Sequence, residues 1–129
     1  AMDHAEDFRV LTPGGHYLTQ QVGTDDFSEA HALFGTPQTA DSGLERTLQR
    51  MAEVGFVIDR AKEWHGPSFF ADVQTYVRYE TLVPWDVPQD FTVDRYRDVL
   101  IGLHQRGPAR GKPLVFTNSR FLVLAHKPE

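Results

Sequence analysis

The stretch RVLTPGGHYLTQQVG, residues 9–23, decides how the rest of the chain is interpreted. Pro13 fixes its own φ and disfavours a helical conformation for the residue before it, while the two glycines that follow accept positive φ without steric cost. A helix that ends near Leu11 is therefore expected to enter a tight turn. Tyr, Leu, Thr and Val then recur in a short run between glycines, which predicts a strand over residues 16–22.

Hydrophobic periodicity predicts the other elements of an α/β fold with four to five helices and three strands. Two capping-box patterns, one beginning at Asp26 and one at Ser42, mark helix starts, and Gly55 is placed to end the second of these helices. The last strand is predicted to be long, because its side chains alternate regularly. Helices are expected over residues 3–11, 27–34, 44–54, 67–82 and 93–106, and strands near residues 16–22, 56–64 and 114–126.

The composition is that of an ordinary globular protein. The chain has 129 residues, 40% hydrophobic and 24% charged, which is typical of one domain with its own core. A net charge of -5 argues against a protein that binds nucleic-acid phosphates, and the absence of cysteine excludes disulfides, thiolate metal sites and thiol nucleophiles. No apolar run approaches the roughly 20 residues of a membrane span, so a cytoplasmic protein without membrane contact is expected.

Three segments, in this order along the chain, resemble the C-terminal half of a class I S-adenosylmethionine-dependent methyltransferase. They are the turn at residues 10–15, the stretch at residues 51–57 and the final strand at residues 120–128. In that family a similar turn precedes the fifth strand, Ala-Gly-Phe is common before the sixth, and the seventh runs antiparallel between these two. Val54 stands where the family usually has that alanine. The resemblance implies a partial, three-stranded mixed sheet of the Rossmann-like methyltransferase fold.

The resemblance also divides the single domain, residues 1–129, into three expected parts. Residues 1–66 are a helix–strand–helix–strand part, residues 67–112 a helical cap-like insertion, and residues 113–129 the final strand. The family covers and selects its acceptor substrate with helices inserted in this region, and aromatic side chains give a pocket a large apolar area. The alternative is that these side chains only pack a core. The aromatic residues expected to bind substrate are Trp64, Phe69, Phe70, Tyr76, Tyr79 and Trp85.

Three further side chains are candidates for a functional site. Gln20 and Gln21 end the first strand, and ligands of open α/β sheets collect outside the carboxyl ends of strands; the alternative is that both are simply solvent-exposed. His65 is the catalytic candidate, because it is suited to moving a proton near neutral pH, although a lone histidine is more often structural. The six histidines are scattered, without an i, i+4 pair, so no metal site is predicted.

The sequence departs from the resembled family in its cofactor motif. The family holds S-adenosylmethionine with a glycine-rich turn after its first strand and an acid at the end of its second, and no Gly-x-Gly-x-Gly occurs here. This chain alone is therefore expected to bind no cofactor. It is interpreted as the substrate-side half of a small-molecule methyltransferase, inactive without a cofactor-binding half that a separate chain could supply.

The alternative is a non-catalytic dimeric module that binds a ligand or a partner. A truncated domain would leave the strand at residues 16–22 as a sheet edge with unpaired backbone groups. A homodimer that pairs through this strand is therefore expected.

Overall fold

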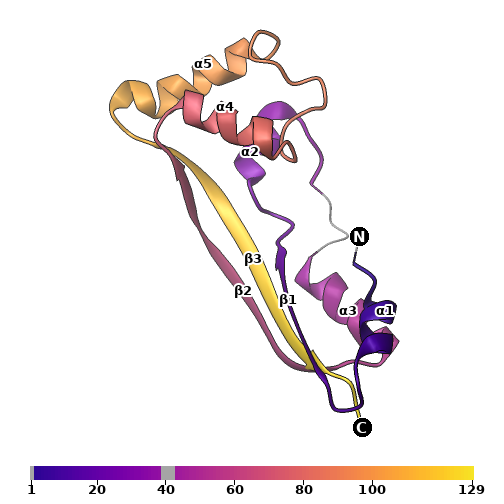
Figure 1. The fold of residues 1–129 in the computed structure, drawn as a ribbon. Helices are drawn as coiled ribbons and strands as arrows, with labels where there is room; N and C mark the ends of the chain where they lie inside the picture. The colour runs from indigo at the N-terminus through magenta and orange to yellow at the C-terminus, as the bar shows by residue number, and fades with distance from the viewer. Residues whose placement is uncertain (1, 39–42) are drawn as a thin grey trace. The chain divides into compact units, whose positions relative to one another are not determined.

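The computed structural model describes residues 2–38 and 43–129, which form an α/β fold with five α-helices and one three-stranded antiparallel sheet (Figure 1). The final strand lies between the other two, so the predicted strand order is confirmed. The elements are α1 (His4–Val10), β1 (His16–Val22), α2 (Ser28–Phe34), α3 (Leu44–Val54), β2 (Val57–Phe70), α4 (Val73–Leu82), α5 (Arg97–Arg106), the 3-10 helix η2 (Pro108–Arg110) and β3 (Leu114–His126).

The chain divides into two compact units. Unit 1 comprises Ala1–Asp26, Thr39–His65 and Ser119–Glu129, and unit 2 comprises Phe27–Gln38 and Gly66–Asn118. Unit 1 therefore contains α1, β1 and α3, and unit 2 contains α2, α4 and α5. The two long strands, β2 and β3, contribute residues to both units.

The predicted turn after α1 is present and leads directly into β1. The Gly15 N–H donates a hydrogen bond to the Thr12 carbonyl at 2.8 Å, and Gly14 between them has a φ of 78°. Gly14 follows Pro13 at the position of a Pro-Gly turn that requires positive φ, which glycine adopts without strain. Gly15 is needed for a different reason, because a Cβ at this position would lie 2.8 Å from the Thr12 carbonyl oxygen.

The core of unit 1 combines side chains of the two helices with those of the strands. Met51 of α3 and Val123 and Ala125 of β3 are fully buried. The predicted apolar stripe of α3 packs here, and Gly55, with a φ of 116°, ends this helix as predicted. Phe56 and Phe121 complete the buried cluster, against which Phe8, Leu11, Tyr17, Leu44, Leu48 and Ile58 pack.

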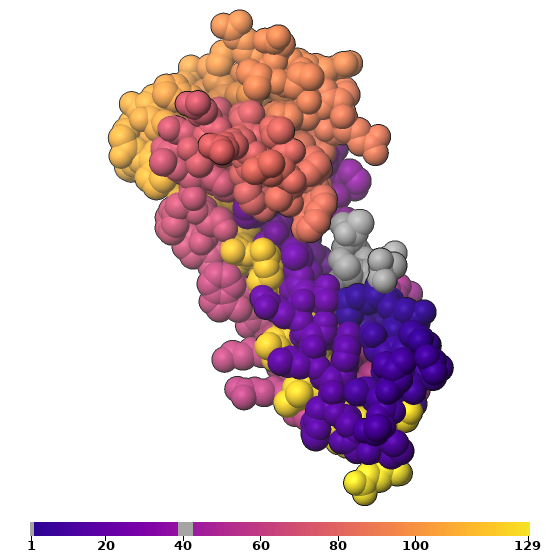
Figure 2. Space-filling view, in the orientation of Figure 1, coloured from indigo at the N-terminus to yellow at the C-terminus, as the bar shows by residue number. Residues whose placement is uncertain are grey.

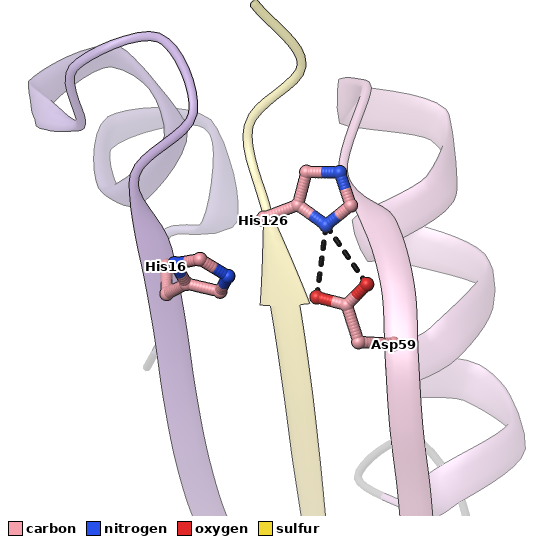
Figure 3. A group of neighbouring side chains, drawn as sticks. All are labelled: His16, Asp59 and His126. Atoms are coloured by element: carbon pink, nitrogen blue, oxygen red, sulfur yellow. Dashed lines mark hydrogen bonds and ion pairs between the residues drawn. The ribbon is translucent and has the colours of Figure 1, made fainter.

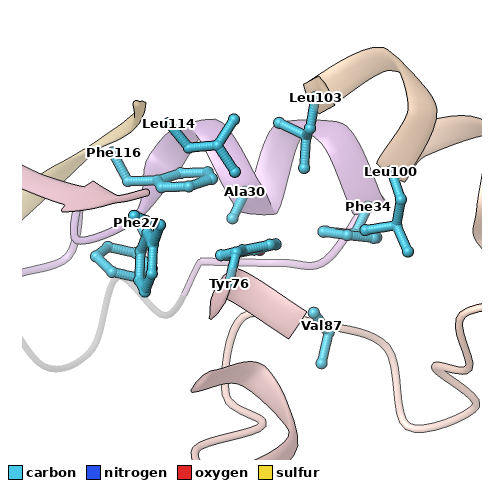
Figure 4. Packing of buried hydrophobic residues seen from close by; sticks show 10 residues of the cluster. Phe27, Ala30, Phe34, Tyr76, Val87, Leu100, Leu103, Leu114 and Phe116 are labelled. Atoms are coloured by element: carbon cyan, nitrogen blue, oxygen red, sulfur yellow. The ribbon is translucent and has the colours of Figure 1, made fainter. Parts of the chain in front are cut away.

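The core of unit 2 is largely aromatic (Figure 4). Tyr76 of α4 is fully buried and stacks on Phe116 of β3, with ring centroids 4.8 Å apart. Phe27 stacks on the same Phe116 ring at 5.4 Å. Offset aromatic pairs of this kind stabilise a core beyond the burial of their surface. The other buried members of this cluster are Ala30, Phe34, Phe70, Val87, Leu100, Leu103 and Leu114.

β3 supplies different sets of side chains to the two cores. Its bounds, residues 114–126, agree with the prediction. The even-numbered Leu114 and Phe116 are buried in unit 2, whereas the odd-numbered Phe121 and Val123 are buried in unit 1. The phase of the alternation therefore changes between the two ends of the strand, which a single alternating pattern does not predict.

Two predicted helix starts are wrong. β2 continues to Phe70, so residues 67–70 are extended and the following helix begins only at Val73. Proline is tolerated here because β2 is an edge strand, where a missing N–H need not break the hydrogen-bond ladder. Thr92 accepts a hydrogen bond from the Arg95 N–H at 3.1 Å in a turn, and α5 starts later, at residue 97.

The capping predictions for the two earlier helices also need correction. The N-cap of α2 is Phe27, with a left-handed φ of 49° and no capping hydrogen bond from its side chain, in place of the predicted Asp26. The N-cap of α3 is Gly43, and the predicted capping residue Ser42 lies outside the described residues. Among the described helices, none combines the length and the apolar character needed to cross a membrane.

Candidate functional site

Polar side chains of unit 1 gather just beyond the carboxyl end of β1. Asp25 and Asp26 follow β1 closely, and Ser119 reaches the same place from β3. Gly23 allows this approach: its N–H donates to the Ser119 carbonyl at 2.9 Å, and a Cβ on Gly23 would collide with Ser119 Oγ. The close approach of the two strands therefore requires glycine at residue 23.

His65, from β2, contacts an acidic side chain in this cluster. Its Nε2 lies 2.9 Å from Asp25 Oδ2 and 3.3 Å from Ser119 Oγ. A hydrogen bond from the Ser119 hydroxyl holds the pKa of Asp25 below its ordinary value, and the backbone N–H of Asp25 and the nearby His65 make smaller contributions in the same direction. About half of each side chain of the pair is exposed, so a solute can reach it. A carboxylate that orients an imidazole in this way is a common arrangement for a general base.

The three side chains do not form the triad of a serine hydrolase. In such a triad the serine and the acid contact different nitrogens of the imidazole ring. Here Asp25 and Ser119 both contact Nε2 of His65. The geometry fits proton transfer by the histidine and does not fit activation of the serine as a nucleophile.

Asp26 holds the first residues of β3 that belong to unit 1. Its Oδ1 accepts hydrogen bonds from the backbone N–H of Ser119 and from Arg120 Nη1, both at 2.7 Å. The Asp26 side chain is only 16% exposed, so the contact with the guanidinium is partly shielded from water. This pair fixes the position of Ser119, which in turn contacts the His65–Asp25 pair.

The residues predicted for unit 1 lie at separate places on the sheet. Gln20 is exposed on β1, and the Gln21 side chain donates a hydrogen bond to Thr19 Oγ1 at 2.9 Å. Trp64 is half-exposed on β2, next in sequence to His65. His65, by contrast, contacts both a carboxylate, Asp25, and a hydroxyl, Ser119.

The aromatic residues predicted for unit 2 fall into two groups. Phe70, Tyr76 and Tyr79 are brought together, with ring centroids 5.3 Å apart for both pairs that include Phe70. These three side chains pack the core of unit 2, as the alternative in the sequence analysis states. Phe69 and Trp85 are instead mostly exposed, at 62% and 74%.

Unit 2 contains cavities that could hold a small molecule. One, of about 450 Å³, lies between α4 and α5 and is almost entirely apolar; it is lined by Val73, Gln74, Val77, Val93, Arg97, Leu100, Ile101 and His104. Another, of about 540 Å³, includes Phe69 together with charged side chains; its lining includes Glu29, Leu33, Leu103, Arg106, Lys112 and Phe116. Phe69, one of the predicted aromatic residues, therefore lines a cavity of this unit.

Unit 2 also buries two acidic side chains. Glu80 is fully buried, and neither of its carboxylate oxygens makes a hydrogen bond within the described residues. Burial, together with the negative charge of Asp86, raises the pKa of Glu80 to about 8. Asp86 itself is paired with His31, whose Nε2 lies 3.1 Å from its Oδ1. With a pKa of about 8, Glu80 is protonated near neutral pH.

The fold of the chain resembles that of solved bacterial proteins. One is a presumed methyltransferase from Bacillus halodurans C-125, with a TM-score of 0.60 and 14% identity over 98% of this chain and 62% of that chain. The chain has the fold of part of a methyltransferase domain. A second structure, the YcgJ protein of Bacillus subtilis, matches this methyltransferase-like domain with a TM-score of 0.58 and 16% identity, over 98% of this chain and 56% of that chain.

The methyltransferase-like domain spans less than two thirds of either of these proteins. At such low identity the likeness establishes the fold alone. A Haemonchus contortus N-methyltransferase in complex with S-adenosylhomocysteine also matches, at 15% identity over 98% of this chain and 29% of that chain, but its TM-score of 0.41 is too low to establish a shared fold. No protein-family model matches the sequence, and no curated protein matches it.

Asp25 and Ser119 were missed by the sequence-based prediction for different reasons. The rule that ligands collect at the carboxyl ends of strands was applied to Gln20 and Gln21, inside β1, although two consecutive acids follow this strand. The position of these two acids directly after the strand could have been recognised in the sequence. The contribution of Ser119 depends on pairing between distant strands, which the sequence alone does not reveal.

Proposed function

We propose that this chain forms the acceptor-binding side of an S-adenosylmethionine-dependent small-molecule methyltransferase, with the cofactor held by residues outside these 129. The alignment of nearly the whole chain with part of a methyltransferase carries this proposal. The sequence contains no glycine-rich cofactor turn. β1 also lies at an edge of the described sheet and exposes Leu18 and Val22, as expected of a strand that a further part of the protein covers.

The His65–Asp25 pair is proposed to act as the general base. Methyl transfer from a sulfonium to a hydroxyl or amine forms a new O–C or N–C bond, breaks the S–C bond and releases the proton of the acceptor. His65 Nε2 contacts Asp25, and no hydrogen bond to Nδ1 is found in the described residues. Nδ1 is therefore placed to accept that proton, while the Asp25 carboxylate stabilises the imidazolium that results.

Acceptor binding can be tested by nuclear magnetic resonance. Backbone amide spectra of the chain are recorded with a panel of small phenols, amines and carboxylic acids. The proposal predicts shifts centred on Asp25, His65 and Ser119 for one acceptor class, and their loss in a His65→Ala variant. His104→Ala, which removes an exposed histidine of unit 2, is the matched control and should leave these shifts unchanged. Shifts that persist in His65→Ala would contradict the assignment of the base.

A second candidate function is a non-catalytic, dimeric ligand-binding module. The apolar cavity between α4 and α5 favours it, because apolar clefts of this size are typical of small-molecule sites. In the experiment above, shifts confined to Val77, Leu100 and Ile101 would support this function against the first. The homodimer proposed next is that of the chain by itself, because a cofactor-holding part that covers β1 would occupy the same strand edge.

The dimer is proposed to form by antiparallel pairing of two β1 strands. Light scattering at tens of micromolar should give the mass of two chains. Leu18→Lys should shift the protein to a monomer, because charged side chains on an edge strand oppose edge pairing. The matched control is Val57→Lys, which changes an exposed aliphatic residue on the other edge strand, β2. A monomeric mass for the unaltered chain would exclude this dimer.

A further inference from the structure

The three strands bring two histidines and one aspartate together in unit 1 (Figure 3). His16 lies on β1, Asp59 on β2 and His126 on β3, and one ligand atom from each lies within 4.8 Å of the other two. His16 and His126 are directly opposite in the antiparallel pairing of β1 and β3. Residues so paired project from the same face of a sheet, which explains how distant histidines meet.

Two members of the group contact each other, and the third lies nearby. Both Asp59 oxygens lie close to His126 Nδ1, at 2.8 and 2.9 Å, and the two imidazole rings are 5.8 Å apart between centroids. About a third of the Asp59 and His126 side chains is exposed, so an ion can enter from solvent. Lys127, next in sequence, does not fill this place, because its ammonium binds the Phe8 and Leu11 carbonyls.

We propose that His16, Asp59 and His126 form a binding site for Zn²⁺. Two imidazole nitrogens and one carboxylate are a donor set that suits zinc and disfavours Mg²⁺, which prefers oxygen ligands. Zinc–ligand bonds are about 2.0–2.2 Å long, so binding requires the imidazole of His16 to move toward the other two ligands. Three protein ligands leave at least one coordination position for water.

The site does not rest on the proposed methyltransferase function. Its ligands lie at the start of β1, near the start of β2 and at the end of β3, whereas Asp25 follows the end of β1. A cation that joins one residue of each strand would tie the three strands of unit 1 together. The sequence-based expectation of no metal site considered only local histidine spacing, and this group is assembled by strand pairing.

The test uses the whole chain and Co²⁺ as a spectroscopic probe, followed by competition with Zn²⁺. One equivalent should bind and give the visible absorption of a cobalt ion with nitrogen and oxygen ligands, and Zn²⁺ should displace it. Zn²⁺ should also raise the melting temperature, since it binds only the folded arrangement. Mg²⁺ should do neither. Absence of cobalt absorption at millimolar metal would overturn the proposal.

Variants locate the site. His16→Gln, Asp59→Asn and His126→Gln should each lower the affinity by at least roughly tenfold, because even residues behind the ligands commonly contribute that much. His65→Gln is the matched control: it alters the other exposed histidine–aspartate pair of unit 1, at a similar distance, and should bind zinc unchanged. Circular dichroism confirms that each variant is folded. Unchanged affinity in the three variants, or loss only in the control, would show that the site is wrongly placed.

A second measurement keeps the proposal testable if a variant does not fold. Imidazole resonances of the unaltered chain are followed during addition of diamagnetic Zn²⁺. Signals of His16 and His126 should change together and saturate at one equivalent, while those of His104 should stay in place. Changes spread over all histidines would indicate adventitious binding and would contradict the site.

Discussion

The two units differ in the exposure of their ionisable side chains. In unit 1 the His65–Asp25 pair lies at the surface, with about half of each side chain exposed. The N-terminal segment of this unit, coloured indigo, is also seen at the surface in Figure 2. Unit 2 instead buries Glu80 and Asp86 beside an aromatic core. Solutes can therefore reach the exposed pair of unit 1, whereas the buried acids of unit 2 mainly affect the stability of the fold.

The largest expected effect comes from the aromatic core of unit 2. Tyr76→Ala should lower the free energy of unfolding by about 3–5 kcal/mol, because it removes a fully buried ring that stacks on Phe116. Urea unfolding measures this change. Trp85→Ala, at a mostly exposed position, should change it by less than about 0.5 kcal/mol. Equal effects of the two substitutions would show that the core is not where we place it.

The pH dependence of stability should reveal the buried acid. Because the folded-state pKa of Glu80 is raised to about 8, the folded state holds this proton more tightly than the unfolded chain does. Stability from this group is full below the ordinary pKa of a glutamate and is lost as the pH rises toward 8. Glu80→Gln should remove that loss and raise the unfolding free energy at pH 9 by roughly 1–3 kcal/mol.

The control for this prediction is the same variant at pH 4, where the unaltered Glu80 is also neutral. There Glu80→Gln should leave the unfolding free energy nearly unchanged. An equal change at both pH values would mean that the substitution acts through packing. The burial of Glu80 in unit 2 would then not make stability depend on its ionisation, and this difference from the exposed pair of unit 1 would be lost.

A smaller effect is expected at the close contact in unit 1. Gly23→Ala should destabilise the protein by about 1–3 kcal/mol, because the new Cβ collides with the Ser119 side chain. Gly102→Ala is the matched control, since a Cβ in the middle of α5 meets no atom within 4 Å. This variant should be neutral or more stable, because alanine favours a helix over glycine. Thermal unfolding of both variants measures the difference.

The smallest effect on stability is expected from the exposed ion pair. Asp25→Asn should change the unfolding free energy by less than about 1 kcal/mol, as is usual for exposed pairs. The same variant should lose the acceptor-induced shifts described above. A large loss of stability without a change in acceptor binding would assign Asp25 a purely structural role and remove the distinction between the two units.

Local signals in the sequence predicted much of the fold. Pro13 and Gly14 determine the turn before β1 through their own φ preferences, and the stripe and terminal glycine of α3 depend only on neighbouring residues. The end of β2 could not be predicted in this way. A helix was predicted from residue 67, yet Pro67 lies in β2, an edge strand in which a proline costs little.

The candidate sites were less accessible to sequence reasoning. His65 was selected for its chemistry, but its partners come from distant parts of the sequence, Asp25 from the turn after β1 and Ser119 from β3. The same holds for His16 and His126, which become neighbours only through the pairing of β1 with β3. Strand pairing decides which side chains meet, and it depends on contacts that are distant in sequence.

The central claim is that this methyltransferase-like domain supplies the acceptor side and leaves the cofactor to residues outside it. Isothermal titration of the 129-residue chain with S-adenosylmethionine tests it most directly. We predict no binding heat up to millimolar cofactor. A saturable isotherm with one site and a micromolar dissociation constant would contradict the claim, because it would place a complete cofactor site within these residues.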